Sequence, residues 1–299
     1  MMATPLRVLL LATVLMSRVG LAPVVTAAER WAGEAAVVTE FIQVQRGDAT
    51  LLVEIQSPAA GRLAARPLLL LNLSGDRQSS LKDGSLGEPA RVFLSEGHRV
   101  ATFDLPAHGE RIDRRGSGID GLRERFIAGD DPFALVIADG KAVIDELLRR
   151  GLMETGRVLV CGVSRAGYCA IRLAAADARI SSVAALAPVT DWRELREFAA
   201  VKDRADVAAL TLDHFVEPLV GRRLYVTIGN ADIRVSTAAC TRFVFALNAA
   251  EQRRALTSSQ LRYDLVDDTV GHALATRWRQ EGARFLLRTG QSAEPTARP

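Results

Sequence analysis

The chain has 299 residues, of which 48% are hydrophobic and 24% charged, and its formal net charge is +3. These values match average globular proteins, so they exclude a disordered chain and a bundle of membrane spans. The basic residues are spread along the chain rather than clustered, which argues against nucleic acid as a partner. The length is sufficient for one large domain built around a single core.

The N-terminus has the pattern of a secretory signal peptide. Arg7 precedes an apolar run, which Arg18 interrupts and which is too short to cross about 30 Å of hydrocarbon. We therefore expect residues 1–28 to be a signal peptide, with cleavage after Ala27 or Ala28. This predicts a periplasmic or secreted protein without a stable membrane span. The alternative is an uncleaved segment on a cytoplasmic protein.

The rest of the chain alternates between segments typical of strands and of helices. Strands are predicted at 37–44, 50–56, 67–73, 99–105, 157–162, 180–186, 223–228 and 261–266, the first two as an antiparallel pair. Helices are predicted at 88–96, 132–150, 166–176 and 273–288. This alternation predicts an α/β protein with a mostly parallel sheet that helices cover on both faces. Catalytic and binding residues of such sheets lie at the carboxyl ends of the strands.

We expect one domain over residues 29–290, followed by a disordered tail at 291–299, because the tail is short and polar. The segment between Asp191 and Arg222 is helical and of mixed charge, which predicts a small helical cap over the site. The cysteines are odd in number and lack metal-ligand spacing, which predicts buried thiols and no metal site: Cys161, Cys169 and Cys240.

The segment RVLVCGVSRAG at 157–167 predicts a strand, a sharp turn that bears Ser164, and a helix. Such a turn strains the serine and requires small residues two positions away on each side, where the chain has Gly162 and Ala166. The helix dipole would favour the negative charge that develops when the serine attacks a carbonyl group. We predict that Ser164 is a nucleophile and that the backbone N–H of Arg165 is one oxyanion donor. The alternative is that Ser164 merely caps the helix.

Two later strand ends supply an acid and a base. One late strand leads into Asp232, and the last strand leads into His272. His272 would take the proton from Ser164, while Asp232 would fix the tautomer of the imidazole and stabilise its charged form. Asp191 also follows a strand and is the alternative acid.

Three motifs together resemble the α/β-hydrolase superfamily, in particular its dienelactone-hydrolase-like and prolyl-oligopeptidase-like branch of serine hydrolases: GVSRAG at 162–167, GNADIRV at 229–235 and VGH at 270–272. The order serine, acid, histidine is also that of the superfamily. The segment from Asp104 to Arg111 is similar to a structural loop of that branch, which implies that His108 is not catalytic. The resemblance implies the α/β-hydrolase fold and no cofactor.

The chain departs from the family pattern after its third sheet strand. The family commonly has His-Gly there, whereas this chain has Asn72-Leu73-Ser74-Gly75-Asp76. A backbone N–H of Gly75 or Asp76 could still be the second oxyanion donor, because the hole requires a donor position rather than a particular side chain. Arg111, Arg114 and Arg115 could rim the pocket and attract acidic substrates, although a solvated loop is the interpretation we favour.

The predicted function is that of a serine hydrolase that cleaves a carboxylic ester of a small molecule through an acyl-enzyme. A serine peptidase acting on short peptides is the alternative within the same mechanism. An alternative of another class is a catalytically silent binding protein with this fold, which the unusual loop at 72–76 suggests.

Overall fold

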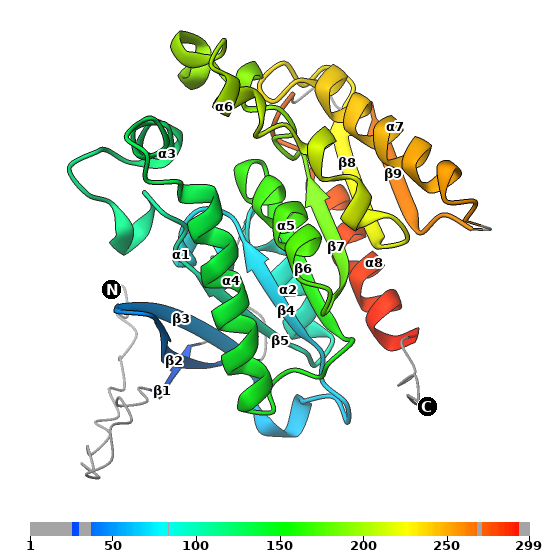
Figure 1. The fold of residues 1–299 in the computed structure, drawn as a ribbon. Helices are drawn as coiled ribbons and strands as arrows, with labels where there is room; N and C mark the ends of the chain where they lie inside the picture. Colours follow the sequence, from blue (N-terminus) through cyan, green and yellow to red (C-terminus); the bar gives the residue numbers. More distant parts are fainter. Residues whose placement is uncertain (1–25, 30–36, 83, 257, 268–270, 293–299) are drawn as a thin grey trace, which may run out of the picture.

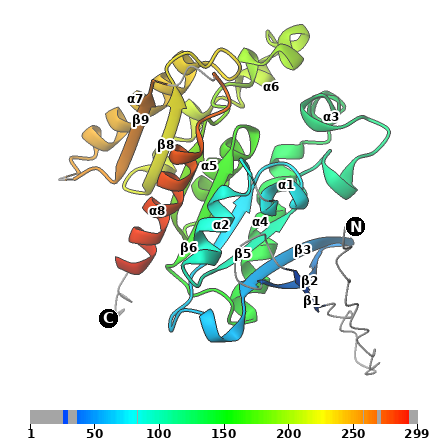
Figure 2. The same ribbon diagram turned by 180° about the vertical axis from the view of Figure 1, so that it is seen from behind.

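The computed structural model describes residues 26–29, 37–82, 84–256, 258–267 and 271–292, which form a nine-stranded sheet with helices on both faces (Figures 1 and 2). The strands are β1 (Thr26–Glu29), β2 (Val37–Arg46), β3 (Ala49–Pro58), β4 (Leu69–Leu73), β5 (Arg99–Phe103), β6 (Val158–Val163), β7 (Ile180–Leu186), β8 (Arg223–Gly229) and β9 (Leu261–Val266). Their order in the sheet is β1-β2-β3-β5-β4-β6-β7-β8-β9. The pairs β1-β2, β2-β3 and β3-β5 are antiparallel. All the later pairs in this order, from β5-β4 to β8-β9, are parallel.

The helices are α1 (Arg77–Leu81), α2 (Glu88–Ser95), α3 (Gly118–Ile127), α4 (Pro132–Arg149), α5 (Arg165–Ala176), α6 (Ala205–Ala208), α7 (Thr237–Arg253) and α8 (Thr276–Ser292). Helices α4, α5 and α7 cover one face of the sheet, and α2 and α8 cover the other (Figures 1 and 2). Every residue of β4 and β6 is buried, because both strands lie in the middle of the sheet with helices above and below. The mostly parallel, doubly covered sheet is therefore confirmed.

The segment between β7 and β8 is helical, as predicted for the cap. It contains α6 and four short 3-10 helices at Trp192–Glu194, Arg196–Val201, Leu212–Phe215 and Glu217–Leu219. The first part of the segment, including α6, lies with α3 beyond the ends toward which the parallel strands run (Figure 1), whereas its last two 3-10 helices pack against α5 and α7 before β8 starts. Trp192 anchors the segment, because its ring lies 4.6 Å from that of Phe133 in α4 and 5.3 Å from that of Tyr168 in α5, centroid to centroid. The cap is thus packed on α4 and α5.

The ends of the chain differ in part from the sequence prediction. Residues 1–25 and 293–299 lie outside the described residues, so the predicted signal peptide is described only in β1, which pairs with β2 at the edge of the sheet. Helix α8 continues to Ser292, past the predicted start of the tail at 291. Within the described part of the chain, no helix combines the length and the apolar character that a membrane crossing requires. The three cysteines are buried and free.

Candidate active site

Ser164 is the single residue between β6 and α5, and its backbone is strained. Its φ of 58° and ψ of −121° lie where residues with a side chain rarely occur. The end of β7 and the loop after it hold the turn, because the Ser164 N–H donates to the Leu186 carbonyl over 2.9 Å and the Ser164 carbonyl accepts from the Val189 N–H over 3.0 Å. The predicted sharp turn therefore exists, and it places Ser164 at the N-terminus of α5.

The turn depends on small residues on both sides of the serine. A Cβ atom at Gly162 would lie 2.2 Å from the carbonyl oxygen of Ala166, which no real Cβ tolerates. A Cβ atom at Gly167 would lie 2.9 Å from the Pro188 side chain, so this glycine lets α5 pack closely on the end of β7. The sequence argument for Gly162 thus has a direct steric basis.

The structure brings Ser164, Asp232 and His272 into one hydrogen-bonded chain. Nε2 of His272 lies 3.0 Å from Oγ of Ser164, and Nδ1 of His272 lies 2.9 Å from Oδ2 of Asp232. A carboxylate only accepts hydrogen bonds, so the proton of the neutral ring sits on Nδ1 and Nε2 can accept from the serine hydroxyl. These three residues are called the candidate triad below.

Asp232 is held as a buried carboxylate. Its side chain is 0% exposed, and it also accepts from the backbone N–H groups of Arg234 at 2.9 Å and Val235 at 3.2 Å. Burial alone would raise the pKa of the Asp232 carboxyl, but the hydrogen bond and charge of His272 and the two amides together lower it. Asp232 therefore stays ionised and can stabilise a positive charge on His272.

Asp191, the alternative acid, is engaged elsewhere. Its carboxylate forms an ion pair of 2.7 Å with Arg193 and a longer one of 3.5 Å with Arg242, and it accepts from the Arg193 backbone N–H. Both ring nitrogens of His272 already contact Ser164 and Asp232. Asp191 thus begins the cap segment, and Asp232 is the acid that the geometry favours.

The three predicted oxyanion-hole residues lie on two neighbouring segments. Arg165 is the first residue of α5, and backbone N–H groups in a first helical turn have no partner inside the helix. Asp76 caps α1 by accepting from the backbone N–H and hydroxyl of Ser79, which fixes the loop after β4. The guanidinium of Arg165 packs on Gly75, where an added Cβ would lie 2.6 Å from Nη2. The two segments therefore meet beside Ser164, while the donor roles of Arg165, Gly75 and Asp76 stay predictions.

His108 is a buried neutral residue that contacts Arg165, an interaction that the sequence did not indicate. Its Nδ1 lies 2.8 Å from the Pro106 carbonyl, and its Nε2 accepts from Nε of Arg165 over 2.7 Å. Burial, with the positive charge of Arg165, lowers the pKa of His108 to about 4. His108 therefore keeps one tautomer near neutral pH and holds the side chain of the residue that follows Ser164.

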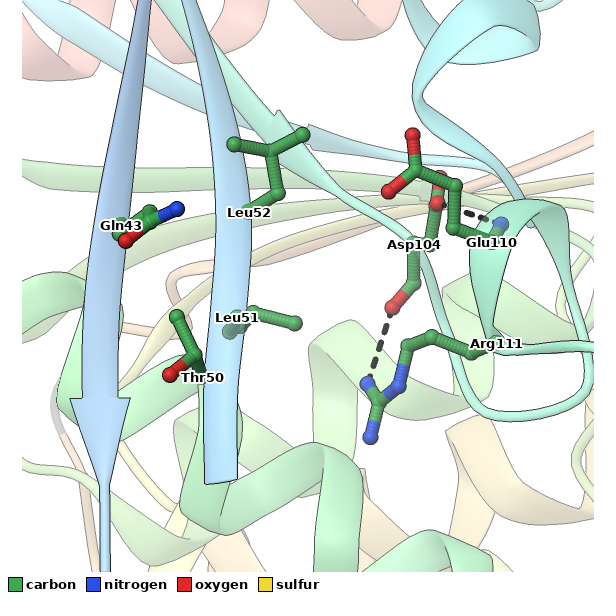
Figure 3. Close-up of a pocket in the computed structure, with 7 residues that line it drawn as sticks. All are labelled: Gln43, Thr50, Leu51, Leu52, Asp104, Glu110 and Arg111. Carbon is green, nitrogen blue, oxygen red and sulfur yellow. Dashed lines mark hydrogen bonds between the residues drawn. The ribbon is translucent and has the colours of Figure 1, made fainter. Parts of the chain in front are cut away.

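Arg111 is not part of a solvated loop, which corrects the favoured sequence interpretation. Its guanidinium donates to the carbonyl of Asp104 over 3.0 Å and to the buried carboxylate of Asp139 over 2.7 Å. Arg111 also lines a cavity of about 350 Å³. Figure 3 shows it together with the other lining residues: Gln43, Thr50, Leu51, Leu52, Asp104 and Glu110. No member of the candidate triad is among the residues that line this cavity.

Arg114 and Arg115 differ from Arg111. Arg114 is exposed, in accord with the solvated-loop interpretation, whereas Arg115 pairs with Asp130 over 2.8 Å. In the segments that the structure describes, no three His, Cys, Asp or Glu side chains converge as metal ligands would.

Comparison with known proteins extends the fold assignment. No family model and no curated protein sequence match the chain. Among solved structures it is similar to a cold-adapted esterase from an Arctic intertidal metagenomic library, with 18% identity, a TM-score of 0.62, and coverage of 89% of this chain and 97% of the esterase. A proposed dienelactone hydrolase from Klebsiella pneumoniae has 14% identity, a TM-score of 0.62, and coverage of 86% of this chain and 99% of its own.

An acetyl xylan esterase from a Paenibacillus species has 16% identity and a TM-score of 0.64, over 89% of this chain and 88% of its own. At such identities the similarity defines the fold. Together with the sheet order and the serine turn, it shows that this protein has the α/β-hydrolase fold, as the resemblance implied.

Proposed function

We propose that the protein is a serine hydrolase that cleaves carboxylic esters of small molecules through an acyl-enzyme. The observation that carries this proposal is the continuous hydrogen-bonded chain from Asp232 through His272 to Ser164, with the serine on a strained turn at a helix N-terminus. An activated serine in this setting is a nucleophile for acyl transfer. Structural neighbours that are named esterases support the same class.

The mechanism follows from these contacts. His272 takes the hydroxyl proton as Ser164 attacks the carbonyl carbon, and ionised Asp232 stabilises the imidazolium. The backbone N–H of Arg165, with that of Gly75 or Asp76, binds the oxyanion of the tetrahedral intermediate. His272 then protonates the departing alkoxide, and the acyl group remains on Ser164. In the second half, His272 deprotonates a water molecule that attacks the acyl-enzyme. The bond between the acyl carbon and Oγ then breaks, and His272 returns the proton to Oγ of Ser164, which releases the acid and restores the serine.

The test uses a fluorophosphonate probe, which phosphonylates activated serines, on the wild type, Ser164→Ala and His272→Ala. We expect one label on Ser164, found by mass spectrometry, and none or a greatly slowed reaction in either variant. No label on folded protein would contradict the proposal and favour the silent binding protein. A label on another serine would reject the assigned turn.

The leaving group requires a separate comparison, because an ester and an amide need the same residues. Wild-type protein is given 4-nitrophenyl acetate and a set of aminoacyl 4-nitroanilides. Hydrolysis of the ester with little anilide cleavage supports the esterase. Cleavage of anilides alone would replace it with the peptidase. Export remains part of the proposal, and N-terminal sequencing of protein from a secreting host tests it: a mature chain starting at Ala28 or Glu29 is expected.

A further inference from the structure

Arg165 carries a positive charge beside the nucleophile without an ion-pair partner among the described residues. Its side chain is partly buried, and its one hydrogen bond within that part of the chain is the contact of Nε with the neutral ring of His108. Burial of a cation without an ion-pair partner is unfavourable, and burial lowers the pKa of Arg165. The two Nη groups therefore remain available to a ligand.

The nearby carboxylates are occupied by other groups. Asp76 and Glu197 are the carboxylates whose charges act most strongly on Arg165. Asp76 is bound to Ser79 at the start of α1, and Glu197 forms a 2.7 Å ion pair with Arg234. Arg234 adds a second positive charge, and within the described residues its Nη1 is buried without a hydrogen-bond partner. The charges of these four groups balance, but neither carboxylate forms an ion pair with Arg165 among the described residues. The guanidinium of Arg165 thus lacks a direct anionic partner.

The position of the guanidinium connects it to the reaction. It packs on Gly75, in the loop that follows β4, while its own backbone belongs to the turn of Ser164. Because His108 occupies Nε, the outer edge with the two Nη groups is the edge that a ligand can approach. A guanidinium edge matches the two oxygens of a carboxylate, with two parallel hydrogen bonds.

We propose that Arg165 binds a carboxylate group of the substrate, so that the preferred substrates are esters that carry a negative charge a few bonds from the scissile carbonyl. This inference rests on the proposed function and names its substrate class. His108 is a positioning residue. Its Nε2 accepts a hydrogen bond from Arg165 and so orients the guanidinium, while its neutral ring adds no negative charge that would neutralise the guanidinium.

The test compares two 4-nitrophenyl esters of equal chain length, the monoester of adipic acid and the ester of hexanoic acid. The wild type is expected to show a kcat/KM at least about 10-fold higher for the adipate ester, with the advantage falling as salt rises. In Arg165→Met the ratio of the two kcat/KM values should fall about 10- to 100-fold, mostly through KM for the adipate ester. Arg165→Lys keeps the charge without the planar edge and should lie between.

Arg204→Met is the matched control, because it removes a positive charge from the cap at a residue that forms an ion pair with Asp206. Its ratio should equal that of the wild type. An equal kcat/KM for both esters in the wild type would overturn the inference, even if Arg165→Met failed to fold. A folded Arg165→Met whose ratio equals that of the wild type would also overturn it. With Ser164 still labelled by fluorophosphonate, either result leaves the proposed function intact. A wild type that is not labelled and hydrolyses neither ester would contradict both the inference and the proposed function.

Discussion

The Asp232 carboxylate accepts a hydrogen bond from Nδ1 of His272 over 2.9 Å, although 40 residues separate the two in the chain. The carboxylate is entirely buried, while the imidazole is 30% exposed, so the ring is fixed from the protein side and open on the other. A base that must exchange protons with a substrate and with water requires both conditions. Under the proposed function, the buried carboxylate thus fixes a base that substrate and water can reach.

Asp232→Asn should lower kcat for a 4-nitrophenyl ester by about 10⁴-fold, because an amide at this position no longer stabilises the imidazolium or the tautomer that accepts from Ser164. Asp191→Asn is the matched control, since it also neutralises a buried carboxylate after a strand. The kcat of Asp191→Asn should stay within about 3-fold of the wild-type value. This substitution should lower the stability of the protein instead. Steady-state kinetics on folded variants measures both. A larger loss of kcat in Asp191→Asn would reverse the choice of acid.

Much of the fold was predictable because it depends on local patterns. The continuous apolar run of β4 and the strand–serine–helix pattern at residues 157–167 predicted buried strands and the turn of Ser164. The ends of β7 and β9 fall at the predicted residues, because turn residues bound these apolar segments on both sides. Chain order and strand ends sufficed to place Asp232 and His272 on the same edge of the sheet.

The features that the sequence did not indicate depend on contacts between distant residues. Nothing near His108 shows that its ring will meet Arg165, 57 residues later. Arg111 looked solvated because its acceptor, Asp139, follows 28 residues on. Helix α1 has only five residues, but one local signal could have predicted its start. Asp76 is a favoured N-cap residue, and its side chain accepts a hydrogen bond from the backbone N–H of Ser79, three positions later.

Gly162→Ala should abolish the turn of Ser164, because the added methyl group would overlap the Ala166 carbonyl at 2.2 Å. We expect a loss of more than about 2 kcal/mol of unfolding free energy and of esterase activity together. Gly61→Ala provides the control, since a Cβ there meets nothing within 4 Å. Urea unfolding should show a change within about 1 kcal/mol for it. Wild-type activity in Gly162→Ala would show that the turn is not needed.

His108 should make the protein less stable in mild acid. Burial and the charge of Arg165 lower its folded pKa to about 4, against 6.5 in the unfolded chain. Between these values the unfolded chain binds more protons, so the contribution is complete above pH 6.5 and is lost as the pH falls toward 4. From pH 7.5 to pH 5 the unfolding free energy should drop by about 2 kcal/mol on this account.

His108→Gln is the informative variant for this pH dependence, because glutamine can still accept from Arg165 but does not titrate. Urea unfolding at the two pH values should show a drop that is smaller by about 2 kcal/mol than in the wild type. Part of the drop should remain, since burial also lowers the pKa of His98. Equal drops in the wild type and His108→Gln would mean that His108 is not held neutral.

Removal of the buried carboxylate of Asp139, which binds the cavity residue Arg111, should destabilise the protein strongly. The Asp139 side chain is 1% exposed and binds Arg46 over 2.5 Å and Arg111 over 2.7 Å. Asp139→Ala would leave two guanidinium groups without their anion in a partly buried region, which should lower the unfolding free energy by about 3 to 5 kcal/mol. Urea unfolding at pH 7.5 measures the change.

Asp130→Ala is a closely matched control, because Asp130 also bridges two arginines, Arg115 at 2.8 Å and Arg125 at 3.0 Å, but is 44% exposed. Water can replace the lost carboxylate there, so the expected cost is below about 1 kcal/mol. Each carboxylate contacts two arginines, so the difference between the two losses of unfolding free energy measures the effect of burial. Equal costs would contradict the argument and would mean that the Arg111 contact stabilises the loop no more than a surface ion pair does.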